Sequence, residues 1–535
     1  MKGGFRLSMT WLHTWSGLII GWLLFAIFLT GTAAVFREEI TIWMTPERGF
    51  TAGPVRAIAL AEARLASVAP VASSWTITPP DARHPSLIVD WVTSAPDGSL
   101  TRHHEVLNAS TGKPERIRET LGGDFFYYFH YRLEQPDRRG WWISGFAAVA
   151  MLLLLTTGVI IHRRFFKDFF TFRQDARPKR AWLDAHTIMG VLALPFHVMI
   201  TYTGLIPILS TVMAAGIIAN YAHGKSVYTA LMDYTPVRNA FLDQRQLRYV
   251  ERKPSGERTA LAPLGPIVQY ALERWEDGRI GRIDVSNPGD RHAVIGVVRH
   301  IGDQLSNQPE RLSFDGTSGQ LLASVRDQGP IVTAFTVMYG LHMARFADVG
   351  VRWMYFLLGL VSTAMIGTGL IFWTVKRRAQ YGAIVPFGHL LVERINVGIV
   401  AGLPVAMAAY MWANRLIPGD LAERVALESR AFYTVWAVMI VFAALRPLNR
   451  AWTEAWTIAA VAIVALPVIN SLTSNRGLPG SLGAQDVIMA SVDVTLLGLG
   501  ALCAFGAWKT AKHGARGVVE GVGTRNIVAA GETAL

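Results

Sequence analysis

The sequence predicts an α-helical polytopic membrane protein with about eight transmembrane helices, two small α+β domains outside the bilayer and an internal duplication in the first four helices. Three observations predict this class. Hydrophobic residues make up 51% of the 535 residues and the mean hydropathy is positive, which excludes an ordinary soluble domain. Several apolar runs are long enough to cross a bilayer, which takes about 20 helical residues. The pattern of the first run also returns later in the chain.

The predicted membrane helices follow from the apolar runs in order. These runs lie at about 11–36, 141–162, 185–210, 351–375, 393–414, 431–447, 455–471 and 487–508. Lys2 and Arg6 precede the first run, as they would in a signal peptide, but this run is longer than a signal segment and is interpreted as a retained helix.

The corresponding domains alternate between the membrane and the outside. We predict a first helix at 1–36, an outside domain at 37–140, helices two and three with a basic loop at 141–210, a second outside domain at 211–350, a fourth helix at 351–378, a four-helix extension at 390–510 and a tail at 511–535.

Lys and Arg in short loops predict the orientation. They are dense at 163–180 and at 376–378, and such loops face the cytoplasm. Both termini are then cytoplasmic, and the two long segments lie on the other side. Topology therefore explains the formal net charge of +12, and no nucleic-acid partner is expected.

The two outside segments share an order of elements. Each begins with a helical pattern, at RAIALAEARLASV and PIVQYALERWEDG, and continues with alternating strand-like runs that end in a hairpin with T-G or S-G. Together with the flanking helices, this order indicates a unit that occurs twice.

Histidines mark the proposed duplication. His13 and His186 each begin the pattern H-T-x-x-G, and each is followed at the same spacing by T-G, ending at Gly31 and Gly204. The return segments carry His130 and His342 ahead of the second and fourth helices. We therefore expect one pair, His13 and His186, near the cytoplasmic face and the other pair near the outer face.

Paired imidazoles on facing membrane helices are suited to binding haem iron. We expect His13, His186, His130 and His342 to be axial ligands of the iron of two haems. The alternative is that these side chains only hydrogen-bond across helices. Two histidines leave no open coordination position, which favours electron transfer over oxygen chemistry.

Other histidines leave further alternatives open. His197 lies eleven residues after His186, about 16 Å deeper in a straight helix, and is either a cofactor ligand near mid-membrane or a core or proton-relay residue. His162 and His389 are ambiguous positions at helix ends. The histidines of the outside domains are expected to be surface residues.

Other catalytic motifs are absent from the sequence. It contains no P-loop, no HExxH and no GxGxxG in a strand–helix context, and its single cysteine, Cys503, excludes CxxC motifs and an internal disulfide. Electrons would therefore come from a membrane quinol or from a separate cytoplasmic donor.

At residues 5–380 the chain resembles the PepSY-associated transmembrane-helix family. The resemblance rests on HTWSGL, HTIMG, FHYRL, LHMARF and GVIIHRRFFKDFFTFR. It implies two PepSY-like periplasmic domains, histidine-ligated b-type haems, location in a bacterial inner membrane and similarity to ferric-siderophore reductases. It further implies electron transfer to a periplasmic ferric siderophore or other ferric chelate, which releases Fe(II) for uptake.

Two other functions remain open from the sequence. One is a non-redox transporter of iron chelates or peptides, and the other is a regulator whose outside domains bind a periplasmic partner. Aromatic and cationic residues near His130 are either chelate contacts or interfacial anchors: Tyr127, Tyr128, Tyr131, Arg132 and Trp141.

Overall fold

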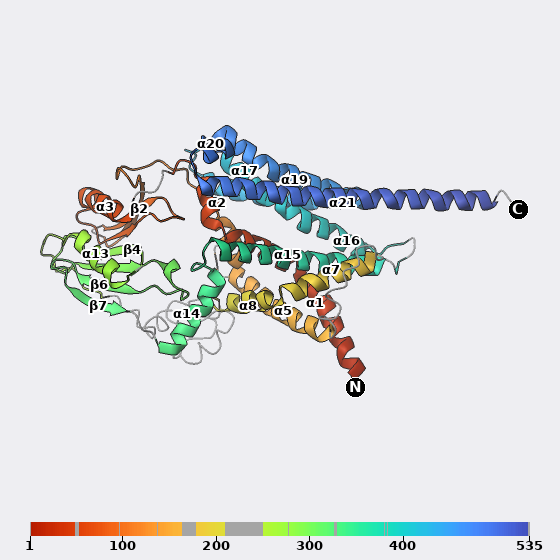
Figure 1. Cartoon of the computed structure of the whole chain (residues 1–535), viewed down its shortest axis with the longest axis horizontal. Helices are drawn as coiled ribbons and strands as arrows, with labels where there is room; N and C mark the ends of the chain where they lie inside the picture. The colour runs from red at the N-terminus through yellow and green to blue at the C-terminus, as the bar shows by residue number, and fades with distance from the viewer. Residues whose placement is uncertain are drawn as a thin grey trace.

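In the computed structural model, a β-sheet domain lies at one end of a long helical bundle, and both chain termini lie toward the other end (Figure 1). The structure describes residues 2–48, 53–95, 97–135, 137, 139–162, 178–208, 250–276, 278–325, 329–378, 380–381 and 384–532. Most of the predicted basic loop at 163–180, and the predicted segment at 209–249, lie outside these residues.

Seven helices of the described chain are long and apolar enough to span a membrane, and a bent pair can form an eighth span. They comprise α1 (Lys2–Ala34), α5 (Arg139–Ile161), α15 (Val349–Arg378), α16 to α17 (Phe387–Leu416), α18 (Arg424–Leu445), α19 (Leu448–Thr473) and the first part of α21 (Val487–Glu532). The predicted polytopic helical membrane protein is therefore confirmed.

The third predicted span, at 185–210, is not one straight helix. It consists of α7 (Pro178–Leu192) and α8 (Leu194–Leu205), which meet at an angle of 67°. Pro195 has no N–H to continue the helical ladder and its ring disfavours helix in the preceding turn, so the chain bends there. The straight-helix estimate for the depth of His197 is therefore wrong.

The predicted outside segments together form a single seven-stranded antiparallel sheet, in the order β3-β2-β1-β4-β5-β6-β7. The first segment contributes β1 (Ser74–Thr78), β2 (Leu87–Ser94) and β3 (Leu100–Leu107). The second contributes β4 (Ile280–Ser286), β5 (Val294–Arg299), β6 (Arg311–Asp315) and β7 (Leu321–Val325). Strands β1 and β4 join the halves, with Trp75 opposite Val285 and Ile77 opposite Ile283.

One hydrophobic core serves both halves of the sheet. Helices α3 (Pro54–Val68) and α13 (Leu264–Arg274) supply buried residues to the same cluster as the inward-facing strand residues. The prediction of two separate small domains is corrected accordingly. A three- or four-stranded half would expose the edge of β1 or β4, and pairing these strands removes both edges.

The C-terminal extension comprises the four helices predicted for 390–510, but it is richer in buried polar residues than the sequence suggested. A five-residue π-helical segment, η2 (Val397–Ala401), separates α16 (Phe387–Asn396) from α17 (Gly402–Leu416). The buried polar side chains of the described extension include Asn396, Asn414, Arg415, Arg424, Glu428, Asn470 and Asp493.

Hydrogen bonds connect these buried polar groups with the N-terminal half of the chain. The indole of Trp43 on α2 (Arg37–Met44) donates to Asp493 at 2.7 Å, and Thr120 donates to Glu428 at 2.5 Å. Tyr410 donates to the Gly122 carbonyl at 3.1 Å. The extension therefore supports the segment that leads into α4 (Asp124–Arg132).

Candidate functional site

Four histidines come from two kinds of helix. His13 and His186 lie on α1 and α7, whereas His130 and His342 lie on α4 and α14 (Gly329–Met343), which precede the long helices α5 and α15. The structure brings them together in the predicted pairs.

We call His13 with His186 the inner pair and His130 with His342, nearer the sheet, the outer pair. The ring centroids are 6.3 Å apart in the inner pair and 6.0 Å apart in the outer pair. A histidine nitrogen lies about 2.0–2.1 Å from a bound metal such as Zn²⁺, so two rings on opposite sides of one metal have centroids roughly 6 Å apart. Both pairs therefore have the separation that a shared metal requires.

All four rings are oriented in the same way, through Nδ1 and a main-chain carbonyl of a facing helix. The four bonds are His13 to Leu154 at 3.1 Å, His186 to Met365 at 2.8 Å, His130 to Ile27 at 2.8 Å and His342 to Ile200 at 3.0 Å. A carbonyl only accepts, so Nδ1 carries the proton and Nε2 of the neutral ring keeps its lone pair. No described residue hydrogen-bonds to these four Nε2 atoms, so they are free to bind metal.

A glycine lies four residues after each accepting carbonyl and leaves room for the ring. A Cβ added to Gly31 would come within 2.5 Å of His130, and one added to Gly204 within 2.8 Å of His342. The corresponding distances are 3.0 Å from Gly369 to His186 and 3.4 Å from Gly158 to His13. The T-G pattern was visible in the sequence, but the sequence did not show that each glycine leaves room for a histidine ring. We call these four positions the glycine seats.

An apolar cavity of about 320 Å³ adjoins the inner pair. Its size falls within the usual range of small-molecule sites, about 300–1,000 Å³. The lining includes both inner-pair histidines, and five glycines that keep its walls flat: Gly17, Gly21, Gly158, Gly190 and Gly369. Lys376 and Arg377 also line it, so the cavity combines flat apolar walls with a cationic margin.

No group of three or more metal-binding side chains occurs among the described residues. A metal at either histidine pair would therefore need its remaining ligands from another source, and the four nitrogens of a porphyrin supply them. The paired imidazoles, the free Nε2 atoms and the glycine seats fit such a group.

The two pairs lie at different depths along α1. His13 belongs to the inner pair, and Gly31, which receives His130, lies 18 positions later, or about 27 Å along the helix at 1.5 Å per residue. This distance approaches the thickness of the hydrocarbon core, about 30 Å.

His197 does not join either pair. Its side chain is fully buried on α8, and neither ring nitrogen has a hydrogen-bond partner of good geometry among the described residues. The hydroxyl of Thr201, one turn later, is also buried without a partner. The sequence-based alternatives for His197, ligand or core residue, therefore stay open.

The two ambiguous histidines have different surroundings. His162 lines the cavity of the inner pair. His389 stacks on Trp373 with centroids 5.8 Å apart and its Nε2 lies 3.2 Å from Glu393, so it packs against the end of α15.

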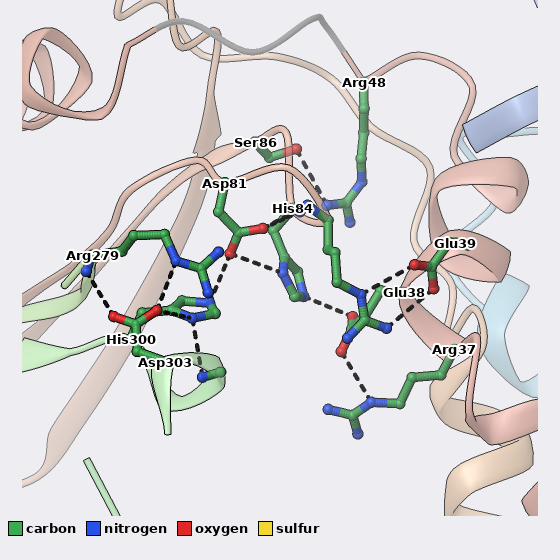
Figure 2. Close-up of polar contacts among 12 residues, drawn as sticks. Arg37, Glu38, Glu39, Arg48, Asp81, His84, Ser86, Arg279, His300 and Asp303 are labelled. Carbon is green, nitrogen blue, oxygen red and sulfur yellow. Dashed lines mark hydrogen bonds and ion pairs between the residues drawn. The ribbon is translucent and has the colours of Figure 1, made fainter. Parts of the chain in front are cut away.

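An ionic junction links the sheet domain to α2, and histidines predicted to be surface residues take part in it (Figure 2). His84 Nε2 lies 2.7 Å from Glu38, and His300 Nε2 lies 3.1 Å from Asp81. Arg83 binds Glu39 through two bonds of 3.1 Å. The junction connects both halves of the sheet to α2, which begins directly after α1.

Electrostatics keep the junction charged near neutral pH. Burial alone would lower the pKa of His84, but hydrogen bonds to Asp81 and Glu38 outweigh it and raise the pKa to about 9. Burial would raise the pKa of Glu38, but His84 and nearby arginines lower it to about 2. His84 and Glu38 are therefore an ion pair across the physiological range.

The aromatic and cationic residues near His130 divide into those that contact one another on or beside α4 and Tyr127, which contacts Arg37 of α2. Arg132 lies over Tyr128, 4.2 Å from the ring centroid, and is 3.7 Å from Glu134, so its charge already has partners. Tyr131 packs edge-on against Trp141 at 5.3 Å. Tyr127 instead faces Arg37, whose guanidinium lies 4.7 Å from its ring centroid.

These features define a class of protein: a polytopic membrane protein with histidine pairs at two depths and a sheet domain at one end. The sequence model of the family described as PepSY-associated TM region matches residues 10–376, and the chain belongs to this family. It is also 25% identical over 375 residues to an uncharacterized protein of Pseudomonas aeruginosa, an alignment that covers 67% of this chain and 87% of that protein.

Proposed function

We propose that the protein is a transmembrane haem b oxidoreductase of the bacterial inner membrane. It would pass electrons from a quinol or a cytoplasmic donor to a ferric siderophore or other ferric chelate in the periplasm. The observation that carries this proposal is the repeated histidine arrangement: four imidazoles, each fixed through Nδ1 and seated on a glycine, in two pairs about 6 Å apart.

In this proposal the chain binds two b-type haems, one between His13 and His186 and one between His130 and His342. Haem supplies a reversible one-electron Fe(III)/Fe(II) couple. The chain fixes both axial imidazoles in their metal-binding tautomer and surrounds the inner site with apolar side chains, which influences its potential. The repeated geometry also supports the duplication predicted from the sequence.

Two imidazoles would hold each haem, so a ferric chelate would receive its electron without binding the haem iron. One electron converts a chelated Fe(III) to Fe(II), which hard oxygen donors hold more weakly. A quinol releases two electrons and two protons, so one quinol would reduce two ferric chelates.

Reduced-minus-oxidised difference spectra of purified protein from haem-replete cells test the proposal. We expect b-type bands with about two haems per chain, and loss of about half the signal in His13→Ala and in His130→Ala. His292→Ala is the matched control, because that ring is exposed in the sheet domain and contacts the Lys253 carbonyl at 3.1 Å. A protein without haem would overturn the proposal.

Reduction of the chelate is tested separately. With dithionite-reduced protein and ferric citrate, we expect Fe(II) to appear in a ferrozine trap at the rate at which the haem bands reoxidise. Bands that stay reduced in the presence of ferric citrate and other ferric chelates would contradict the proposed substrate class.

A further inference from the structure

Four hydrogen-bond donors lie one turn beyond the outer pair, toward the sheet. Tyr127 precedes His130 by three residues, and Tyr339 precedes His342 by three residues, so each tyrosine shares a helix face with its histidine. Two arginines accompany the phenols. The four residues, which we call the outer donor cluster, are Arg37, Tyr127, Tyr339 and Arg345.

The members of the cluster face one another. The guanidinium of Arg37 lies 4.7 Å from the Tyr127 ring centroid. Burial raises the pKa of Tyr127, the nearby Tyr339 phenol raises it further, and Arg37 and Arg345 oppose this shift. Burial likewise lowers the pKa of Arg345, and the charge of Arg37 lowers it further. Arg37 and Tyr127 are therefore in contact, and Tyr339 and Arg345, on α14 and directly after it, lie within electrostatic range of them.

Two carboxylates lie near the cluster, and both form ion pairs with Arg37 rather than with Arg345. Arg37 has carboxylate partners in Glu38 and Asp124, each at 3.0 Å. In contrast, Arg345 has no ion pair or side-chain hydrogen bond within the described residues, and the charges of Glu38 and Asp124 reach it only at longer range. The hydroxyls of Tyr127 and Tyr339 also have no hydrogen-bond partner in the described part of the chain.

An unpaired, largely buried cation beside two unpaired phenols is costly unless an anion joins them. Guanidinium groups bind carboxylates through two parallel hydrogen bonds, and phenols add single donors. The main chain at Arg345 packs closely against the sheet domain: its carbonyl oxygen lies 2.9 Å from where a Cβ would stand on Gly302, beside the ionic junction.

We propose that the outer donor cluster binds a carboxylate group next to His130 and His342. Two sources have this chemistry: a propionate of a haem held by the outer pair, or a carboxylate of an acidic ferric chelate. The first source rests on the proposed function, whereas the second requires only the cluster.

Arg345→Gln and the double variant Tyr127→Phe with Tyr339→Phe test the proposal in detergent-purified, full-length protein. Arg132→Gln and Tyr128→Phe are matched controls on α4, because these side chains already have partners. Size-exclusion profiles and melting temperatures identify variants that fail to fold, and Arg345→Lys, which keeps the charge, should recover part of any loss.

Equilibrium dialysis with radioactive ferric citrate tests the chelate source, and haem content with the midpoint potential of each haem tests the propionate source. Weakening of citrate binding by about tenfold or more, at unchanged haem content, would assign the cluster to the chelate. Loss of haem, or a shifted potential of the outer haem alone, would assign it to a propionate.

Cluster variants that match the controls in both measurements would overturn the proposal. A wild-type protein without haem would overturn the proposed function, yet citrate binding that depends on Arg345 would still support the cluster. The two failures are therefore distinguishable.

Discussion

At the scale of single residues, each of the four histidines is held by a main-chain carbonyl, and the hydroxyls of Thr157 and Thr203 add a second contact to the Nδ1 of His13 and His342. A carbonyl in a helix cannot rotate away, so it fixes both the tautomer and the direction of each ring. Three of the four accepting carbonyls, those of Ile27, Met365 and Ile200, lie within 3.0 Å of the histidine Nδ1. The hydrogen bond does not depend on which residue supplies the carbonyl, because the side chain of Ile27 takes no part in it.

The glycine seats lead to a graded prediction. Gly→Ala inside a helix normally stabilises by about 0.5–1 kcal/mol. Here we expect Gly31→Ala and Gly204→Ala to remove about half of the b-type difference signal, because the added methyl group would come within 2.5 and 2.8 Å of a histidine ring. Gly158→Ala, at 3.4 Å, should retain most of it.

Haem content per chain measures this series, and Gly4→Ala is the control because nothing lies within 4 Å of its added methyl group. Equal haem contents in Gly31→Ala and Gly4→Ala would show that the outer ring tolerates the methyl group and that the seat has no role.

A second residue-level prediction concerns pH. The pKa of His84 is raised to about 9, so its stabilising contribution is fully present below the unfolded-state value of 6.5 and is lost as pH rises through 9. We expect a contribution of about 1 kcal/mol at most, because the side chain is 40% exposed and the ion pair is screened. Melting temperatures from pH 6 to 9.5 measure this loss.

His84→Gln should lower the melting temperature at pH 6 and flatten its decline up to pH 9.5. His292→Gln is the control, because this ring is exposed and has no carboxylate partner among the described residues, its hydrogen bond being to the Lys253 carbonyl at 3.1 Å. A decline that is as steep in His84→Gln as in the wild type would assign the pH dependence to another group.

At the scale of elements, the β1–β4 pairing makes the sheet one structural unit. Ile283 of β4 is fully buried in the core shared by both halves, and its truncation to Ala should cost about 2–5 kcal/mol. Because the core is shared, we expect hydrogen–deuterium exchange to accelerate in 54–107 as well as in 264–325. Acceleration confined to 264–325 would instead favour two independent domains.

The C-terminal extension packs against α4, the helix that carries His130 of the outer pair. Phe432 is fully buried and lies 5.0 Å from Phe125 and 5.4 Å from Phe129, between ring centroids. Phe432→Ala should cost about 3–5 kcal/mol and loosen the helix that carries His130. We expect broadened or lost signals of the outer haem in electron paramagnetic resonance, with the inner haem unchanged.

The exposed Val438 of the same helix offers the control, Val438→Ala, because its side chain contributes nothing to this aromatic cluster. Equal changes at both haems in Phe432→Ala would indicate general destabilisation rather than an effect through α4.

The sequence predicted those elements that depend on local patterns. The long apolar runs and the helices α3 and α13 follow from hydrophobic periodicity, and the matched spacing of His13 and His186 predicted their pairing. The β1–β4 union depends on contacts between segments about 200 residues apart, which no local pattern contains. The bend before Pro195 had a local signal, but the apolar run masked it.

The same limit applies to the candidate site. Histidine is chemically conspicuous and was found, whereas the outer donor cluster draws its members from three distant places in the chain: Arg37, Tyr127 and the segment with Tyr339 and Arg345. The ionic junction was missed for the same reason: His300 meets Asp81 only after the two halves of the sheet have joined, and His84 meets Glu38, 46 residues earlier, only after the first half has folded.

At the scale of the whole molecule, the sheet lies at one end of the bundle and both termini lie toward the other (Figure 1). Lys376, Arg377 and Arg378 end α15 away from the sheet, and the positive-inside rule assigns that end to the cytoplasm. Under the proposed function, the inner pair would then be the electron entrance and the outer pair the exit, so the direction of transfer depends on this orientation.

Cysteine labelling tests the orientation, because the single native cysteine, Cys503, is buried and gives a low background. Ser99→Cys lies in the exposed turn between β2 and β3, and Ala511→Cys lies at the exposed end of the last span. In cells whose outer membrane has been made permeable, a membrane-impermeant maleimide should label Ser99→Cys and spare Ala511→Cys, whereas inverted inner-membrane vesicles should give the opposite result. Labelling of Ala511→Cys in the cells with a permeable outer membrane would contradict this topology. It would place the outer pair, with its donor cluster, on the cytoplasmic face.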